Sequence, residues 1–214
     1  MKKIFAALAL AVVGLAVFAQ DITLPAPKSK IGLDLADAIK ARSTSRTFVA
    51  KDIPAEDLST VLWAANGLKG PDAVSSATKA GRTIAYSGDN AYLDVYVFTA
   101  KGAYLYDPDK NLLKQVAKGE LRDKVTVEFI KTSPALVLFA LDTAKLPSFA
   151  KGGFGDALGT GTAGAAAESA SLAASGLKLS TIIMYNINAK TISSIGVFSA
   201  TEKPISFIQM GYAQ

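Results

Sequence analysis

The sequence predicts a single α+β domain in which helices and strands pack as layers. The chain has 214 residues, of which 50% are hydrophobic and 19% charged, so it can bury a sizeable core. Two β-rich runs joined by the short stretch TAKG have the pattern of a hairpin. Helical and strand-like segments alternate after this hairpin, which is typical of layered α+β packing.

The first residues have the pattern of a secretory signal peptide. Lys2 and Lys3 precede an apolar run, and the small residue Ala19 precedes Gln20. The alternative is a transmembrane anchor, but the run is shorter than the roughly 20 residues that a membrane span needs. We therefore expect cleavage after Ala19, a periplasmic or secreted protein, and no membrane association after cleavage. An extended leader over residues 20–32 and a domain over residues 33–214 would follow.

Two helices are predicted before the first β-rich run. The first begins at Leu33 and ends near Ala41, because apolar residues recur there at three-residue steps. The second opens at Pro54, which a first helical turn tolerates, and ends at Gly67. The apolar face of the second helix consists of Leu58, Val61, Leu62 and Ala65.

Residues 70–90 are rich in Gly, Ser and Thr and predict a long loop. A small-residue helix within 155–179 should pack closely against another helix, of this chain or of a second copy. The other expected elements are a hairpin over 92–109, a helix over 121–129, a buried strand over 134–141, strands over 180–187 and 205–213, and a short helix over 190–195.

The composition excludes several classes of function. The chain has no cysteine, so the fold has no disulfides, and no histidine, which removes Ser-His-Asp and Cys-His nucleophile systems and gives zinc catalysis no support. The formal net charge of +5 is a weak excess, and the basic residues are scattered. Nucleic-acid binding therefore has no support.

The stretch RSTSR, residues 42–46, has the composition of an anion-binding loop. Arg42 and Arg46 flank three hydroxyl side chains. A phosphate dianion favours charge-assisted donors, and arginine supplies a planar fork of them. The alternative is an ordinary solvated loop whose hydroxyls cap the next turn.

With these elements placed, the chain resembles the flavin-dependent nitroreductase family, and within it the branch of the azoline dehydrogenases of peptide maturation. Four stretches carry the resemblance: RSTSRTF followed by IPAEDLSTVLWAANGL, RT followed by LDVYVF and GAYLYDPD, LRDKVTVEFIKTSPALVLFALD, and AAAESASLAASGLKLSTIIMYNI followed by GY. The resemblance implies a central, mainly antiparallel sheet flanked by helices.

The resemblance also implies an FMN cofactor. In the family, an Arg-x-Ser/Thr-x-Arg/Lys-x-Phe element grips the FMN phosphate, which matches Arg42, Thr44 and Arg46, with Phe48 in the core. A backbone amide after the penultimate core strand approaches flavin N5, and the matching residues are Met184 and Tyr185. Simple strand packing is the alternative for those two residues.

One loop departs from the family pattern. The family's second flavin-contacting loop reads close to Arg-Thr-Ala-Pro-Ser-Ala-x-Asn-x-Gln, whereas this chain has RTIAYSGDNA. Asp89 takes the Asn place and Ala91 the Gln place, and a carboxylate can only accept hydrogen bonds where an amide can donate. Two alternatives would compensate for the lost amide. Asn90 would take its place after a one-residue slip in the alignment, or Arg82 would offset the negative charge of Asp89.

Two functions follow as expectations. The first is an exported FMN-dependent oxidoreductase that acts on a small molecule by ping-pong hydride transfer, as a homodimer with flavin between the subunits. Because NAD(P)H is cytoplasmic, its electron donor would differ from the family's usual one. The second is a protein of this fold without redox activity that binds a flavin, another small ligand or a partner protein. The candidate cofactor-binding residues are Arg42, Ser43, Thr44, Arg46, Arg82, Ser87, Asp89, Asn90, Met184 and Tyr185.

Overall fold

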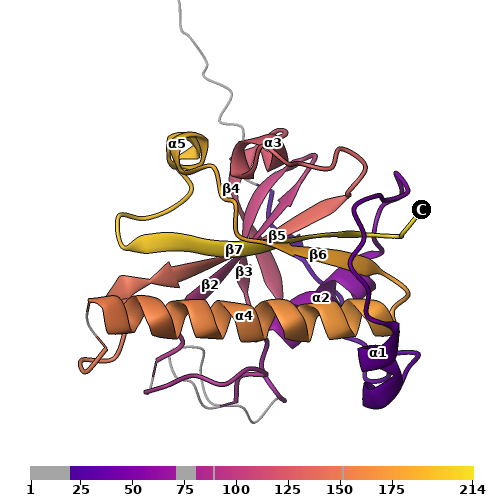
Figure 1. Ribbon diagram of the computed structural model, residues 1–214, viewed down its shortest axis with the longest axis horizontal. Coiled ribbons are helices and arrows are strands. Elements are labelled where there is room, and N and C mark those ends of the chain that lie inside the picture. Colours follow the sequence, from indigo (N-terminus) through magenta and orange to yellow (C-terminus); the bar gives the residue numbers. More distant parts are fainter. Residues whose placement is uncertain (1–19, 71–80, 89, 151) are drawn as a thin grey trace, which may run out of the picture.

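A seven-stranded sheet lies between two layers of helices in the computed structural model (Figure 1). The structure describes residues 20–70, 81–88, 90–150 and 152–214. The predicted signal peptide, residues 71–80 of the predicted loop and Asp89 therefore lie outside the described residues. No helix within the described ranges is long and apolar enough to cross a membrane.

The elements follow one another in an order that places long antiparallel strands at the centre. The strands are β1 (Ile22–Thr23), β2 (Leu93–Thr99), β3 (Gly102–Asp107), β4 (Leu112–Lys118), β5 (Ala135–Asp142), β6 (Ser180–Met184) and β7 (Glu202–Gly211). The helices are α1 (Leu35–Ala41), α2 (Ala55–Asn66), α3 (Arg122–Val125), α4 (Gly153–Gly176) and α5 (Ala189–Ile192), with 3-10 turns η1 (Thr143–Lys145) and η2 (Ser193–Ile195).

The sheet has the order β1-β4-β3-β2-β5-β7-β6, and each neighbouring pair is antiparallel. This confirms the predicted α+β fold with a central antiparallel sheet. The hairpin of β2 and β3 turns at Ala100 and Lys101, as the stretch TAKG predicts. β1 and β6 form the two edges of the sheet.

Strand β5 is buried along its whole length because helices cover both faces of the sheet. On one face, Val137 and Phe139 pack with α2 and α4. On the other face, Leu136 and Leu138 pack against the side that carries α3 and α5. Figure 1 shows α2 and α4 below the sheet and α3 and α5 above it.

Helix α4 is the longest helix, with 24 residues, and its inner face consists of small side chains. Within the predicted small-residue helix, the stretch Ala163–Ala174 is mostly buried in this chain, where Ala163, Ala166, Ala167 and Ala170 belong to the core with α2. The exposed side of α4 carries a different set of residues, Ala157, Thr160, Gly161, Ala165 and Glu168.

Several sequence-based element boundaries are wrong. β4 follows β3 in a three-stranded meander, where the sequence predicted only a two-stranded hairpin. The helix predicted over 121–129 is the single turn α3, and α4 begins at Gly153, ahead of the predicted range 155–179. In α1 only Ala38 is buried, while Leu35 and Ile39 are 68% and 56% exposed.

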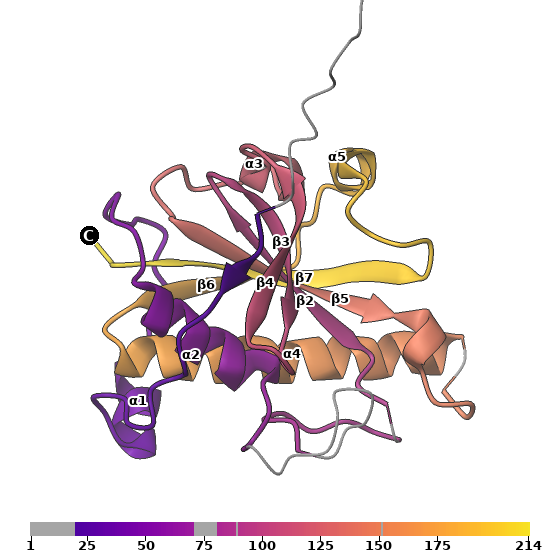
Figure 2. The same cartoon turned by 180° about the vertical axis from the view of Figure 1, so that it is seen from behind.

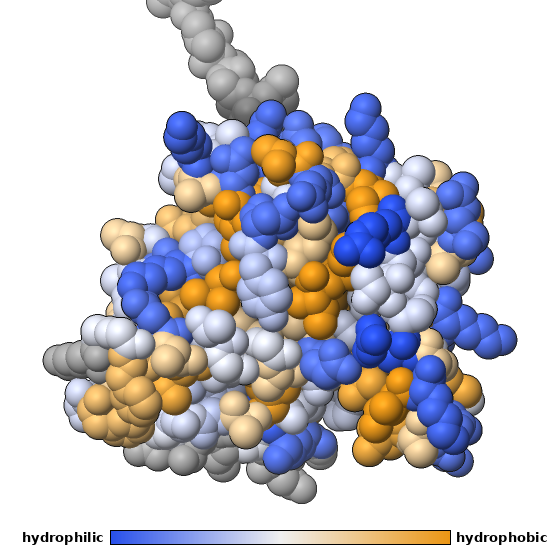
Figure 3. Space-filling model, viewed as in Figure 1, coloured by the Kyte–Doolittle hydropathy of each residue, from blue (hydrophilic) through white to orange (hydrophobic). Residues whose placement is uncertain are grey.

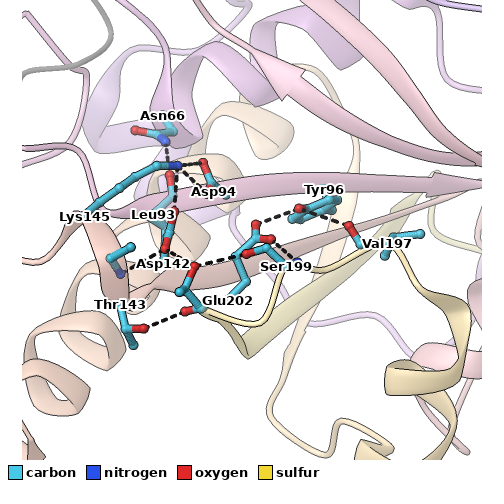
Figure 4. Close-up of polar contacts among 12 residues, drawn as sticks. Asn66, Leu93, Asp94, Tyr96, Asp142, Thr143, Lys145, Val197, Ser199 and Glu202 are labelled. Carbon is cyan, nitrogen blue, oxygen red and sulfur yellow. Dashed lines mark hydrogen bonds and ion pairs between the residues drawn. The ribbon is translucent and has the colours of Figure 1, made fainter.

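A polar network joins β2, β5 and β7 at one end of the sheet (Figure 4). Lys145 donates to both carboxylate oxygens of Asp94 at 2.8 and 2.6 Å, and it lies 3.3 Å from Asp142. Burial raises the pKa of Asp94, although the Lys145 hydrogen bonds oppose the rise. Burial also acts to raise the pKa of Asp142, but a hydrogen bond from Thr201 and other contacts bring it below its usual range. One ammonium therefore pairs with two carboxylates.

In the first turn of α4, we expect a glycine-to-alanine change to destabilise the protein at the inward-facing Gly155 but not at the outward-facing Gly153. A Cβ on Gly155 would lie 2.8 Å from the Ala150 carbonyl oxygen and 2.6 Å from Leu146 Cδ1, whereas one on Gly153 would meet nothing within 4 Å. Gly155→Ala should lower the unfolding free energy by about 1–3 kcal/mol. The control Gly153→Ala should stay within about 1 kcal/mol of the parent. Urea unfolding measures both, and equal effects would contradict the packing described for this turn.

Replacing Lys145 should destabilise the protein in a pH-dependent way. In Lys145→Met the partly buried Asp94 loses its cation, so its folded pKa rises further above the unfolded value of about 3.9. A raised carboxyl pKa favours folding when protonated, so the loss should be about 1–2 kcal/mol at pH 7 and should shrink as the pH falls towards 4. Adding Asp94→Asn should reduce this pH dependence. A loss of the same size at pH 4 and pH 7 would contradict the pairing.

Candidate functional site

The stretch 42–46 covers the free edge of β6. Thr44 forms a parallel bridge with Thr181, and the backbone N–H of Ser45 donates to the Thr181 carbonyl at 3.1 Å. Because β6 is the edge strand of the sheet, its outer side offers backbone partners that no other strand uses. The arginine-rich stretch is therefore held as an additional strand-like segment at this edge.

The two arginines of this segment stand in different environments. Arg42 caps the C-terminus of α1 and is half-buried, with its Nε 3.8 Å from Oε1 of Glu168 on α4. Arg46 is exposed and forms no ion pair with any residue that the structure describes. Ser43 and Thr44 are exposed as well. Arg46 and the two hydroxyls are thus open to an anionic ligand, whereas the guanidinium of Arg42 already lies near a carboxylate.

Core contacts on both sides hold this segment in place. Phe48 is 1% exposed, which confirms the prediction that it packs into the core, and Val49 N–H donates to the Tyr212 carbonyl at 2.8 Å. On the α4 side, the Thr181 hydroxyl donates to Ser171 Oγ at 2.9 Å. The segment therefore presents its polar side chains from a fixed backbone.

Strand β6 leads from this segment to Met184 and Tyr185. Met184 is 9% exposed, and its Sδ accepts from Gln209 Nε2 at 3.2 Å, so its side chain belongs to the core as the strand-packing alternative expects. Tyr185 is 60% exposed at the end of the strand. At about 3.3 Å per residue, Thr181 and Tyr185 lie about 13 Å apart along the edge.

A cavity of about 430 Å³ opens beside Tyr185, between the α5–η2 segment and the start of β7. Glu202 lines it and accepts a hydrogen bond from the Tyr96 hydroxyl at 2.6 Å. Burial, together with the nearby Glu202 carboxylate, raises the pKa of Tyr96 well above its usual value, so this phenol stays protonated. Phe198, which packs edge-on to Tyr96, adds an apolar wall.

The remaining candidate residues lie in a second place. The loop that carries Arg82, Ser87 and Asn90 runs below α4, whereas the segment 42–46 lies at one end of the molecule beside β6 (Figure 1). Arg82 is 5% exposed and donates to the Asn66 carbonyl at 2.7 Å. Ser87 and Asn90 are exposed. Within one chain, the structure therefore brings 42–46 and 184–185 together but keeps this loop apart from them.

Two exposed aromatic residues beside that loop were not predicted as site residues from the sequence. Phe149 and Phe154 are 60% and 55% exposed, with ring centroids 6.3 Å apart. The loop packs tightly against Pro147 and lies close to Phe149, because a Cβ on Gly88 would be 2.7 Å from Pro147 Cβ and 3.6 Å from Phe149 Cε1. Glu168, the neighbour of Arg42, was also missed. The only sequence signal for Phe149 and Phe154 was the presence of two aromatic residues within a glycine-rich stretch.

Within the described part of the chain, no group of three or more acidic side chains is arranged to hold a metal ion. The candidate site offers guanidinium groups, hydroxyls and backbone amides. These are suited to holding a phosphate and a polar ring system.

Comparison with solved structures gives consistent results. A protein described as a nitroreductase from Ralstonia eutropha JMP134 is 26% identical, with a TM-score of 0.81 over 91% of this chain and 90% of that chain. The Escherichia coli microcin synthetase McbBCD complex contains a chain that is 15% identical, with a TM-score of 0.66 over 100% of this chain and 85% of that chain. The latter likeness is one of fold.

A third structure carries a cofactor. It is a nitroreductase from Desulfovibrio desulfuricans in complex with FMN, 16% identical, with a TM-score of 0.55 over 85% of this chain and 87% of that chain. A comparison with curated proteins gave no match. The family profile described as "Nitroreductase family" matches residues 39–212, which include both the segment 42–46 and the end of β6. The chain therefore belongs to the nitroreductase family.

Proposed function

We propose that the protein is an FMN-dependent oxidoreductase that acts on a small molecule. The observation that carries the proposal is the segment 42–46, which presents two arginines and two hydroxyls at the edge of β6. The exposed end of the same strand lies about 13 Å away at Tyr185, far enough for the phosphate and the ring of one cofactor to occupy the two ends.

The residues present fit this cofactor. Arg42, Arg46, Ser43 and Thr44 would hold the phosphate through charge-assisted hydrogen bonds. The backbone at Met184 and Tyr185 would lie against the ring, and the buried Met184 side chain fixes that backbone from below. FMN, when bound, supplies hydride transfer through its N5 atom, and the protein then needs only to bind and orient it.

The proposal includes a homodimer in which a second copy completes each site. Ser87 and Asn90 are exposed and lie away from the segment 42–46 of their own chain, so they would reach the flavin ring of the partner, while the buried Arg82 would tie the loop that carries them to Asn66. The exposed face of α4 suits close packing of two copies because most of its residues are small and Gly161 and Gly164 have open space around them. Figure 3 shows this near-neutral face between one hydrophobic patch over α1, at Leu35 and Ile39, and a paler one at Phe149 and Phe154.

We also propose that the protein acts outside the cytoplasm. The support is the sequence pattern of Lys2, Lys3, the apolar run and Ala19. An exported enzyme would not meet cytoplasmic NAD(P)H, so the proposal includes a different electron donor or a substrate that itself reduces the flavin.

The second candidate function is ligand binding without redox chemistry. The departure at Asp89 and Ala91 favours it, because these residues replace amides that could donate to the flavin ring. The visible absorption spectrum of the purified protein mixed with FMN separates the two candidates. A bound and reducible flavin supports the oxidoreductase, and a protein that leaves FMN free supports the second candidate.

If the segment 42–46 holds the FMN phosphate, its arginines should matter more for FMN than for riboflavin, which lacks that phosphate. Arg42→Ala and Arg46→Ala should each weaken FMN binding by about 2–4 kcal/mol, or roughly 30-fold to 1,000-fold. Thr44→Ala should cost about 1 kcal/mol as the loss of a neutral donor. Glu168→Gln should strengthen FMN binding, because it removes a carboxylate 3.8 Å from Arg42. Fluorescence titration with the two flavins measures all four variants.

The matched control is Lys190→Ala, which removes an exposed positive charge on α5. It should leave the affinity for both flavins within twofold of the parent. If FMN and riboflavin bind equally well and neither arginine variant changes this, the segment 42–46 is only a solvated loop.

The dimer proposal predicts a mass of two chains by light scattering at micromolar concentration. Ala165→Arg places a long charged side chain on the exposed face of α4 and should shift the protein to monomers and weaken FMN binding at the same time. Lys110→Arg, on the loop between β3 and β4, should change neither property. A monomeric parent that binds FMN tightly would contradict a site shared between copies.

A further inference from the structure

A second cleft runs from β1 to the start of β5 and contains no residue of β6. Its walls come from β1, the residues that enter α2, the turn between β2 and β3, and the stretch that precedes β5, which are seen from behind in Figure 2. The volume is about 450 Å³, which is within the range of small-molecule sites. None of its lining residues belongs to the segment 42–46 or to β6.

The interior of the cleft is apolar. Leu24 and Leu113 are 5% and 1% exposed and belong to the core that α2 and α4 share with the sheet. Tyr104 and Leu58 continue this surface, and Ile22, which is 36% exposed, extends it towards the solvent. The cleft therefore opens from the surface directly onto core side chains, and a ligand in it would be in contact mainly with hydrocarbon.

The rim of the cleft is cationic. Lys51, Lys101, Arg122 and Lys131 line it, against the single carboxylate of Asp52. Two of these charges are already engaged, because Arg122 pairs with Glu120 and Lys51 Nζ lies 4.2 Å from the centre of the Tyr212 ring. Lys101 and Lys131 are exposed and have no ion pair with the residues that the structure describes. They are the charges that a ligand would meet.

The wall between rim and interior is rigid. Arg122 is 7% exposed, and its Nη1 donates to the carbonyls of Ser133 and Pro134 at 2.6 and 3.2 Å. The Ser133 hydroxyl in turn donates to the carbonyl of Met210 at 3.0 Å, which ties this stretch to β7. A cleft with fixed walls costs little to order on binding, which favours a specific ligand over a passing contact.

We propose that this cleft binds a small amphipathic anion, with its apolar body against Leu24, Leu58, Tyr104 and Leu113 and its anionic head between Lys101 and Lys131. The ligand class is an aliphatic or aromatic carboxylate or sulfonate that fits about 450 Å³. A neutral apolar molecule would gain no attraction from the two exposed ammonium groups, and a highly polar anion such as a free phosphate would leave the apolar interior empty. The site is separate from the proposed flavin site, so its occupant need not be the redox substrate.

The test uses a matched pair of fluorescent probes on the purified protein saturated with FMN. 1-Anilinonaphthalene-8-sulfonate has an aromatic body and one sulfonate, and N-phenyl-1-naphthylamine is the same body without the charge. We expect the sulfonate to bind more tightly, and decanoate to displace it. Lys101→Ala/Lys131→Ala should weaken the sulfonate about tenfold and leave the neutral probe within twofold.

The control Lys110→Ala/Lys190→Ala removes two exposed positive charges elsewhere and should leave both probes within twofold of the parent. Circular dichroism checks that both double variants keep the parental fold. Sulfonate binding that is equally strong in the two double variants would overturn the proposal, because the probe would then occupy another apolar surface. Displacement of the sulfonate by added FMN in unsaturated protein would overturn it as well, by placing the probe in the flavin site.

Discussion

The small side chains of α4 are the constraint on which the rest of the structure depends. A helix of 24 residues lies against the sheet and α2 at once, which is possible because alanine, glycine and serine fill its inner face. The same helix holds the surroundings of the candidate site. Ser175 Oγ donates to the Ala38 carbonyl of α1 at 3.2 Å, Ser171 accepts from Thr181 of β6, and Glu168 faces Arg42. A larger residue on this inner face would therefore disturb the core and the anion-binding segment together.

The residues that hold the backbone of the candidate site differ from those that could contact a ligand. The side chains that fix the backbone of the site, such as Phe48, Met184 and Gln209, are buried and satisfied within the chain. Those that could meet a cofactor, such as Arg46 and Thr44, are exposed on that fixed backbone. Such an arrangement positions donors without using the ligand to order them, and this lowers the cost of binding.

Much of the fold could be predicted from the sequence because its strongest signals are local. The apolar run of β5 and the face of α2 are encoded in periodicity, and the Gly67 stop in residue type. β4 was missed because Lys114 and Gln115 break the apolar alternation, and its pairing with β3 supplies what propensity does not. The segment 42–46 was found because its residue types are chemically distinctive. No local pattern contains the place of this segment beside β6, its neighbour Glu168 or its distance from the loop with Arg82. These features depend on residues that lie far apart in the sequence.

The backbone partners of the segment 42–49 come from far along the chain. Thr44 and Ser45 pair with Thr181, and Phe48 and Val49 pair with residues 212–213, only a few positions from Gln214. Because a ribosome adds residues in order, this segment is made before Thr181 and residues 212–213, its backbone partners. The apolar Phe48 therefore lacks its partner Ala213 until more than 150 further residues have been added. The part of the molecule that carries its most distinctive chemistry is thus completed only after β6 and β7 have been made.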